Sequence, residues 1–302
     1  MLVRFKRLKI LILRIPSNLR VYSFSASHKP VLKVKPNSLI VFEVKDAFDG
    51  QLDLSGEYLS NVDTVDRSRV NPATGPVWVE GAKPGYTIEV EILNVKVGDR
   101  GFIGRRVFKI LDNTIEAESF KIPVKPVIGV IGVAPPEGEV STIEQGDFGG
   151  NLDTSEITVG SKVFLPVWVE GGLLALGDVH AVQGDGEVSG QGLEVPAEVE
   201  VKIKLHRGRV VDKVLVDYNG SLTVLSSSKN LEEAIEDVLG AAKKLLQKAF
   251  KLDEQTALTL LSLTSNLGVS QIVNPKKTVK IKIPKNILPI NLDELIKIGA
   301  EL

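Results

Sequence analysis

The sequence predicts an α+β fold, in which a mainly β body, a sandwich or barrel-like structure, carries helices packed in its C-terminal third. Short apolar runs, alternating or continuous, follow one another from residue 21 to 225, as expected for strands. Helical periodicity is confined to residues 229–265. The 27 glycines and 15 prolines separate many of the short runs, which is typical of the turns between strands.

The strand pattern is clearest in four segments. Residues 39–44 form a nearly continuous apolar run, which favours a buried strand. Residues 88–92 and 199–205 alternate strictly between apolar and charged side chains, as strands with one buried face do. A further strand is expected at 276–284. Residues 57–74 are polar and lack steady periodicity, so they predict either a mobile lid over a site or an ordinary surface loop.

Two helices are expected after the strands. Residues 231–250 place apolar side chains on one helical stripe, with acids early and lysines late, as the helix dipole favours. Asn230 is suited to cap this helix, and Asp253 to cap a second one that runs to residue 265. The C-terminal tail, residues 286–302, is expected to contain a short amphipathic helix over 291–302.

One hexapeptide occurs twice in the chain. Pro-Val-Trp-Val-Glu-Gly stands at residues 76–81 and again at 166–171, and the two copies carry the only two tryptophans. Six identical residues in a row suggest two related β units. The alternatives are coincidence and convergent packing.

Composition limits the chemistry available to the chain. It has 302 residues, enough to bury a large core, and no cysteine, which excludes disulfides, thiolate metal ligands and cysteine nucleophiles. Any site that uses an imidazole must draw on His28, His180 or His206. The single methionine and the many valine, isoleucine, lysine and glutamate residues suggest a thermophilic source.

Charge is unevenly distributed along the chain. Residues 1–20 carry six basic side chains and no acid, so we expect a basic extension in front of a catalytic domain at 21–285. The other 31 basic residues face 38 acidic ones, which argues against a nucleic-acid partner. The apolar run at 10–13 is too short to span a bilayer, and no convincing cleavage site follows it. We therefore predict a cytoplasmic protein without a membrane partner.

The segment 177–187 holds the densest group of polar side chains. Asp178 and His180 are two residues apart, so on a strand they share a face, and Asp185 and Glu187 repeat this spacing after a bend. Buried carboxylates are costly unless a partner or a metal compensates them. The segment therefore predicts a metal-binding or amide-binding site, and the alternative is a solvated hairpin whose Asp and Gly residues only make turns.

Two further segments offer oxygen ligands. Asn151 and Asp153 share a strand face next to a glycine pair, and Asp46 stands at the end of the buried strand 39–44. Together with one imidazole, these carboxylates and amides form the ligand set expected for zinc or a harder cation.

Several motifs, in the same order along the chain, resemble the acetamidase/formamidase family of small-amide hydrolases. The most specific is His-Ala-Val-Gln-Gly-Asp-Gly-Glu at residues 180–187. The motifs lie at residues 24–32, 46–51, 75–85, 149–153, 177–187, 257–262 and 271–275, within a match of roughly 22–285. The resemblance implies hydrolysis of formamide, acetamide or related short amides to acid and ammonia, a bound metal, and a homo-oligomer, a dimer or larger.

Metal-activated water is the simplest nucleophile for such a reaction in a chain without cysteine. We expect His180, Asp153, Asp46 and Glu187 to bind a divalent metal. Zinc is the expected ion and calcium the alternative.

The catalytic side chains are expected to be Glu187, Asp185 and Asn151. Glu187 would take the proton of the water and return it to ammonia. Asn151 or a glycine N–H would hold the developing oxyanion, and Asp185 would lie beside the metal. His206 is expected to be exposed, because it lies on the polar face of an alternating strand, whereas His28 could donate to the site or cap a strand.

Two other functional classes stay open at this point. A serine mechanism could use Ser189 or Ser55, although neither stands in a nucleophile-elbow pattern. A non-catalytic β-rich protein could hold a structural cation or a small ligand in the same acidic loops, and it would bind metal without turnover.

Overall fold

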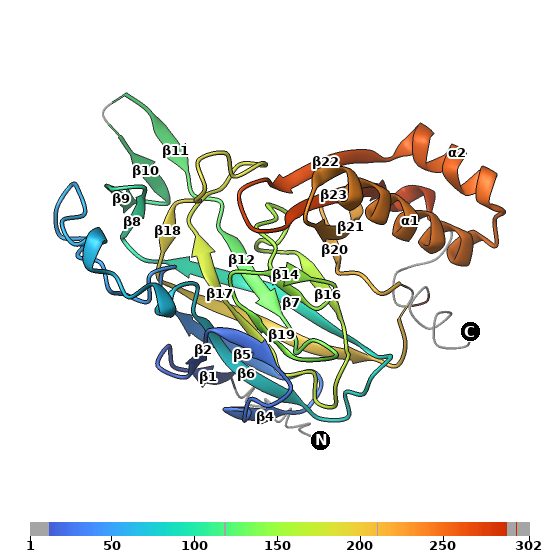
Figure 1. The fold of residues 1–302 in the computed structure, drawn as a ribbon, viewed down its shortest axis with the longest axis horizontal. Coiled ribbons are helices and arrows are strands. Elements are labelled where there is room, and N and C mark those ends of the chain that lie inside the picture. The colour runs from blue at the N-terminus through green and yellow to red at the C-terminus, as the bar shows by residue number, and fades with distance from the viewer. Residues whose placement is uncertain (1–11, 118, 210, 289–293, 295–302) are drawn as a thin grey trace, which may run out of the picture.

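The computed structural model describes residues 12–117, 119–209, 211–288 and 294. Two large sheets pack face to face in the body, and helices α1 (Leu231–Phe250) and α2 (Glu254–Thr264) lie together at one end of it (Figure 1). Within the described residues, neither large sheet closes on itself, so the body is a sandwich and not a barrel. The predicted α+β fold with a mainly β body is confirmed.

The first large sheet has nine strands, and only its edge pair β1–β5 is parallel. Its strands in spatial order are β1 (Ile12–Ile15), β5 (Leu39–Val44), β19 (Ala197–His206), β7 (Thr87–Val97), β16 (Lys162–Pro166), β20 (Leu215–Tyr218), β21 (Ser221–Ser228), β23 (Lys277–Pro284) and β22 (Asn266–Gln271).

The second large sheet has twelve strands, and only its pair β4–β6 is parallel. Its main path is β11 (Lys121–Pro123), β10 (Thr114–Glu116), β9 (Arg106–Leu111), β8 (Arg100–Ile103), β18 (Glu194–Val195), β17 (Leu174–His180), β12 (Val127–Gly132), β15 (Gly149–Asn151) and β14 (Gln145–Gly146). Off this path, β6 (Ala73–Val79) pairs with β17, β2 (Arg20–Val21) and β4 (Leu32–Val34). A separate pair joins β3 (Ser23–Ser25) to β13 (Glu139–Ser141).

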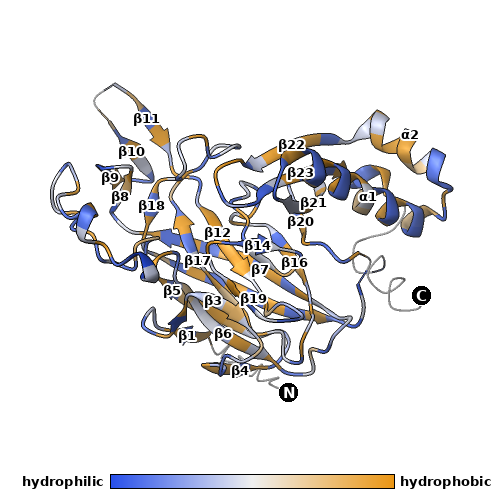
Figure 2. Ribbon diagram, in the orientation of Figure 1, coloured by the Kyte–Doolittle hydropathy of each residue, from blue (hydrophilic) through white to orange (hydrophobic). Residues whose placement is uncertain are grey.

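Apolar side chains from both large sheets form one continuous core. Phe42, Val90 and Val199 reach it from the nine-stranded sheet, and Ile128 and Leu174 reach it from the twelve-stranded sheet. The predicted alternation of the long strand β19 is confirmed, since its residues alternate between buried and half-buried. Strand β12, in contrast, is buried along its whole length and is mostly hydrophobic (Figure 2).

The two copies of the hexapeptide stand at corresponding corners of the sandwich. The copy at 76–81 ends β6 and leads into β7, so the chain crosses there from the twelve-stranded to the nine-stranded sheet. The copy at 166–171 leads from β16 back to β17, in the opposite direction. The corners touch, because the N–H of Val79 donates to the carbonyl of Gly171 at 2.9 Å.

Both predicted helices form at the far end of the nine-stranded sheet. Helix α1 (Leu231–Phe250) packs on β21 and β23, and α2 (Glu254–Thr264) packs on α1. The predicted caps are present, since the side chain of Asn230 accepts from the N–H of Glu233 at 2.9 Å, and that of Asp253 from the N–H of Thr256 at 3.0 Å. Strand β22, which follows α2, was not predicted.

Part of the expected basic extension packs on the folded body. Residues 12–15 form β1 on the edge of the nine-stranded sheet, and Ile15 is buried in the core. Arg14 and Arg20 are ion-paired to acids of the body. Residues 1–11 lie outside the described residues, as does nearly all of the expected helix at 291–302. The described residues also contain three 3-10 turns: Val62–Thr64, Arg67–Arg69 and Lys285–Ile287.

Among the described residues, no helix combines the length and the hydrophobicity that a membrane span needs.

Candidate active site

Five buried ionisable side chains converge at one end of the twelve-stranded sheet. Asp178 and His180 come from the end of β17, and Glu194 comes from β18, where it stands directly opposite His180. Asp153 follows β15, and Glu187 lies in the loop between β17 and β18. We call these five side chains the carboxylate–histidine cluster.

The geometry of this cluster suits a metal ion. Asp153, His180 and Glu187 offer ligand atoms within 4.8 Å of one another, and so do Asp178, His180 and Glu194. His180 is shared by both groups: its Nε2 lies 3.3 Å from Glu194 Oε1 and 3.6 Å from Asp178 Oδ1. Four carboxyl groups around one imidazole give a strongly acidic environment, which a cation would compensate.

The other nitrogen of His180 has a hydrogen-bond partner that fixes the tautomer. Nδ1 lies 2.8 Å from Oε1 of Gln183, whose amide nitrogen in turn donates to the carbonyl of Asp153 at 2.7 Å. Because the Gln183 oxygen can only accept, Nδ1 carries a proton, and in the neutral imidazole the lone pair of Nε2 then faces the carboxylates. Histidine ligands of metals are typically oriented in this way.

Two asparagines each donate a hydrogen bond to one carboxylate oxygen of a neighbouring aspartate. The second oxygen of each aspartate is left to the cluster. Asn274 donates to Oδ2 of Asp153 at 2.6 Å, and Asn71 donates to Oδ2 of Asp178 at 3.1 Å. Within the described part of the chain, Oδ1 of both aspartates is buried without a hydrogen-bond partner. Unpartnered buried carboxylate oxygens are rare, and they are what a metal site requires.

Asn151 lies between the same two aspartates. With its amide nitrogen turned toward them, it donates to Oδ2 of Asp153 at 3.3 Å and to Oδ2 of Asp178 at 3.2 Å, and its oxygen accepts from Asn274 at 3.1 Å. The geometry therefore favours a role for Asn151 in orienting the two carboxylates.

The backbone around the cluster is unusual. Asp153, Asp178 and Glu187 all have left-handed φ angles, of 44°, 49° and 47°. Such conformations cost non-glycine residues on the order of 1–3 kcal/mol and tend to cluster at functional sites. The surrounding structure therefore holds these three carboxylates in place at a cost in stability.

Two glycines allow the cluster to pack tightly. A Cβ atom on Gly129 would lie 2.5 Å from Oδ1 of Asp153, and one on Gly192 would lie 2.4 Å from Cγ of His180. Both positions therefore require a residue without a side chain.

Burial and mutual repulsion shift the pKa values of the cluster. Burial, together with the charge of Asp178, raises the pKa of Asp153 to about 6. Burial, together with the charge of Asp153, raises the pKa of Glu187 to about 8. Burial also raises the pKa of Glu194, whereas the adjacent carboxylates of Glu194 and Asp178 outweigh burial and raise the pKa of His180. A bound cation would favour the ionised carboxylates instead.

The structure separates two of the predicted residues from the cluster. The carboxylate of Asp46 accepts from the backbone N–H groups of Phe48 (2.9 Å) and Gly50 (3.3 Å), so it caps a turn. Asp185 pairs with Lys280 at 2.6 Å. Neither belongs to the two groups of candidate metal ligands.

Two cluster residues were outside the predicted ligand set. In the sequence, Asp178 is marked only by the strand face that it shares with His180, and Glu194 carries no local signal. Glu194 comes from a strand of two residues, and only its register with His180 could have revealed it.

The remaining candidates lie elsewhere. The prediction that His206 is exposed is wrong: its side chain is 13% exposed, and its Nε2 lies 2.7 Å from the buried Glu89. His28 contacts Ser23 Oγ at 2.9 Å, outside the cluster. Ser189 lies on the rim of the cavity described next, with its hydroxyl 3.4 Å from the carbonyl of Gln191.

The four carboxylates of the carboxylate–histidine cluster line a cavity of about 530 Å³. Asp153, Asp178, Glu187 and Glu194 line its acidic side. Val62, Arg67, Val70 and Asn71 of the segment 57–74 also line the cavity, so this segment forms part of the cavity wall.

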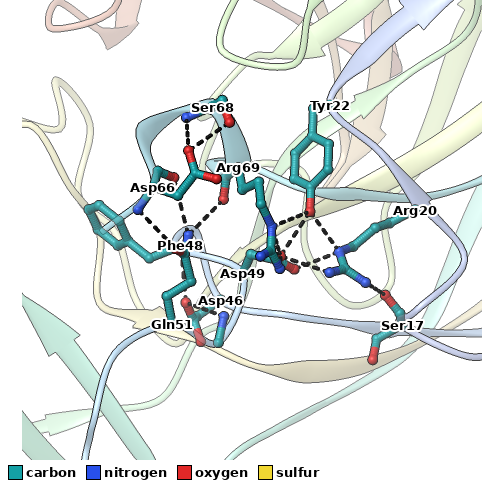
Figure 3. A network of polar contacts seen from close by, with 11 residues as sticks. Ser17, Arg20, Tyr22, Asp46, Phe48, Asp49, Gln51, Asp66, Ser68 and Arg69 are labelled. Atoms are coloured by element: carbon teal, nitrogen blue, oxygen red, sulfur yellow. Dashed lines mark hydrogen bonds and ion pairs between the residues drawn. The ribbon is translucent and has the colours of Figure 1, made fainter. Parts of the chain in front are cut away.

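A network of polar contacts around Asp49 supports this wall (Figure 3). Arg69, from the wall, donates to Oδ2 of Asp49 through Nε at 3.1 Å, and Arg20 donates to the same oxygen at 2.7 Å. The hydroxyl of Tyr22 donates to it at 2.8 Å. Burial alone would raise the pKa of Asp49, but these donors outweigh it and hold that pKa below its usual range.

Asp49→Asn should therefore lower stability in a pH-dependent way. We expect a loss of about 2 kcal/mol in the free energy of unfolding at pH 7, because charged hydrogen bonds of this kind contribute roughly that much. A depressed carboxyl pKa stabilises the fold above its unfolded value of roughly 3.9 and ceases to do so as the pH falls through the folded pKa. Denaturant titrations at pH 7 and pH 3 should show the difference shrinking at pH 3; an equal difference at both would contradict this account.

The fold and the cluster define a β-rich protein with a buried carboxylate–histidine centre, and comparison with known proteins identifies its family. Residues 26–114 and 136–289 match the Acetamidase/Formamidase family, and the chain belongs to this family. The family resemblance expected from the motifs is thus confirmed.

Individual relatives agree with this assignment. A "recombinant predicted acetamidase/formamidase" from Thermoanaerobacter tengcongensis is 35% identical, with a TM-score of 0.89 over 95% of this chain and 99% of that one. Acetamidase from Bacillus halodurans is 32% identical, with a TM-score of 0.88 over 92% of this chain and 100% of that one. Formamidase from Methylophilus methylotrophus is 26% identical over 249 residues, 58% of this chain and 61% of the relative. The chain spans about three fifths of the length of the curated relatives of this type.

Proposed function

We propose that this protein hydrolyses the carbon–nitrogen bond of a short-chain aliphatic amide, formamide or acetamide, to a carboxylate and ammonia with the help of a divalent metal. Family membership supports the reaction class. The observation that carries the proposal is the gathering of cavity-lining carboxylates around His180, with buried oxygens of Asp153, Asp178 and Glu194 that have no hydrogen-bond partner among the described residues.

Asp178, His180 and Glu194 are the proposed metal ligands, with Asp153 beside them. The first three lie on the paired strands β17 and β18, which is a rigid support for a ligand set. One imidazole with several carboxylates suits zinc, and calcium is the alternative ion. Compared with the ligands expected from the sequence, the proposed set includes Asp178 and Glu194 and omits Asp46 and Glu187. A metal bound there would polarise the amide carbonyl and lower the pKa of a water molecule.

Glu187 is the proposed proton carrier. It lies in the loop between β17 and β18 and lines the cavity. In the two groups of candidate ligands, it stands with Asp153 and His180, whereas the proposed ligands Asp178, His180 and Glu194 form the other group. Its ionised form, favoured near a cation, accepts the proton of the attacking water and delivers it to the leaving nitrogen. Asn71, Asn151 and Asn274 keep the aspartates oriented during this transfer.

The first test of the proposal is ammonia release from formamide and acetamide by the purified, zinc-loaded protein. We expect steady turnover of at least one of the two amides. Bound metal without ammonia release would overturn the proposal in favour of a non-catalytic protein with a structural cation.

Gln183→Leu tests the orientation of His180. Because Leu cannot accept from Nδ1, the imidazole loses its fixed tautomer, and we expect the Kd for zinc to rise by roughly 10–100-fold. Calorimetric zinc titration measures this change. Gln183→Glu keeps an acceptor at the same place and serves as the control; a Leu variant that binds zinc like the wild type would refute the orienting role.

The assembly and the setting are proposals of the same kind. We propose a homo-oligomer, a dimer or larger, in the cytoplasm of a thermophile. The exposed apolar side chains of Leu111, Phe120 and Ile122 on the arm formed by β9 to β11 support self-association. Light scattering on the purified protein measures the oligomeric state.

A further inference from the structure

Lys280 is a fully buried charged residue outside the carboxylate–histidine cluster. It lies on β23 and has a relative exposure of 0%. Its Nζ contacts Asp185 Oδ1 at 2.6 Å, Glu156 Oε2 at 2.7 Å and Ser155 Oγ at 3.4 Å. Fully buried lysines are rare and require such partners.

The partners of Lys280 belong to two loops that each carry a cluster residue. Ser155 and Glu156 follow Asp153 by two and three residues, and Asp185 precedes Glu187 by two. The loops also touch each other directly, since Ser155 Oγ donates to Asp185 Oδ1 at 2.7 Å. One ammonium group therefore links the loop of Asp153 to the loop of Glu187.

The strand pair β22–β23, which carries Lys280, also holds the backbone beside Glu187. The N–H of Gly186 donates to the carbonyl of Ser270 at 2.9 Å, and the N–H of Ile272 donates to the carbonyl of Gly186 at 3.2 Å. Ser270 lies on β22, which pairs with β23. The part of the nine-stranded sheet that carries the helices thus supports the loop that carries the proposed proton carrier.

We propose that Lys280 is a positioning residue, which fixes Glu187 relative to Asp153 by neutralising Glu156 and Asp185 between the two loops. Without the charge of Lys280, the carboxylates of Glu156 and Asp185 would repel each other, and the two loops that carry them would separate. A displacement of about 1 Å at a catalytic group can cost 10²-fold in rate. This inference rests on the proposed function for its kinetic test only.

Lys280→Met is the principal variant, and Lys282→Met is its matched control. Lys282 is two residues further along β23 and contacts Glu156 Oε1 at 3.2 Å, but its side chain is 37% exposed, and the 2.6 Å contact to Asp185 belongs to Lys280. For acetamide we expect Lys280→Met to lower kcat by roughly 100-fold with KM changed less than threefold. Lys282→Met should stay within roughly threefold of the wild type, and Lys280→Arg should restore part of kcat.

Hydrogen exchange gives a readout that does not depend on turnover. We expect faster amide exchange over residues 183–192 in Lys280→Met and unchanged exchange there in Lys282→Met. Asp185→Ala, at a half-exposed side chain, provides the same comparison if Lys280→Met does not fold. Wild-type kcat and wild-type exchange in Lys280→Met, or equal losses in the control, would overturn the inference. A wild type that releases no ammonia would refute the proposed function, while the exchange data would still decide the role of Lys280.

Discussion

Glu187→Gln is expected to lower the turnover of acetamide by roughly 10³-fold, because general acid–base catalysis by one positioned side chain typically contributes 10²–10⁴-fold. The substitution preserves the size of the side chain, but glutamine cannot carry the proton from water to the leaving nitrogen. Since the proposed ligands are Asp178, His180 and Glu194, the variant should keep its metal.

Zinc content and kcat measured on the same sample separate the two roles considered for Glu187. Retained zinc with lost turnover identifies the proton carrier, whereas loss of both would assign Glu187 to the ligand set. Ser189→Ala, on the rim of the same cavity, is the control and should turn over normally. An inactive Ser189→Ala with an active Glu187→Gln would instead favour a serine mechanism.

His180→Ala should remove both metal binding and turnover. His180 is the only member common to the two candidate ligand groups, and it supplies their only nitrogen. Its removal also leaves Asp178 and Glu194 facing each other without the imidazole. We expect no stoichiometric zinc after dialysis and a loss of at least roughly 10³-fold in kcat/KM.

The control for this variant is His28→Ala, which removes a half-buried imidazole that contacts Ser23 outside the cluster. It should retain zinc and activity. Zinc bound at one ion per chain in His180→Ala would refute the proposed centre.

The sequence was informative where the pattern of one element alone determines its structure. Strand β19 and helix α1 follow from their periodicity, and the caps Asn230 and Asp253 follow from residue type. Strand β22 was missed because Asn-Leu-Gly-Val-Ser-Gln contains a glycine and has no clear alternation, and it forms by pairing with β23. Likewise, β1 could not be recognised in the basic leader, because only its pairing with β5 makes it a strand.

The candidate site shows the same limit. His180, Asp153 and Glu187 were predicted from local spacing, and the structure brings them together. Asp46 fits the same local reasoning, but its carboxylate is used by its own turn. Glu194 could not be predicted from local spacing, because it joins the cluster through its cross-strand register with His180.

His206 and Lys280 also required the fold. The alternation of β19 correctly gave the face on which His206 lies, but not the buried Glu89 that it meets on the neighbouring strand. Lys280 appears in sequence as an ordinary polar position of an alternating strand, whereas the fold covers it with two loops.

The most direct test of the proposed metal centre is a titration of zinc into the chelator-stripped protein, with bound zinc per chain and ammonia release from acetamide followed together. We expect no turnover without metal, and a rise in turnover that is proportional to bound zinc and saturates at one ion per chain. Full turnover in the stripped protein, with zinc confirmed absent, would contradict the account.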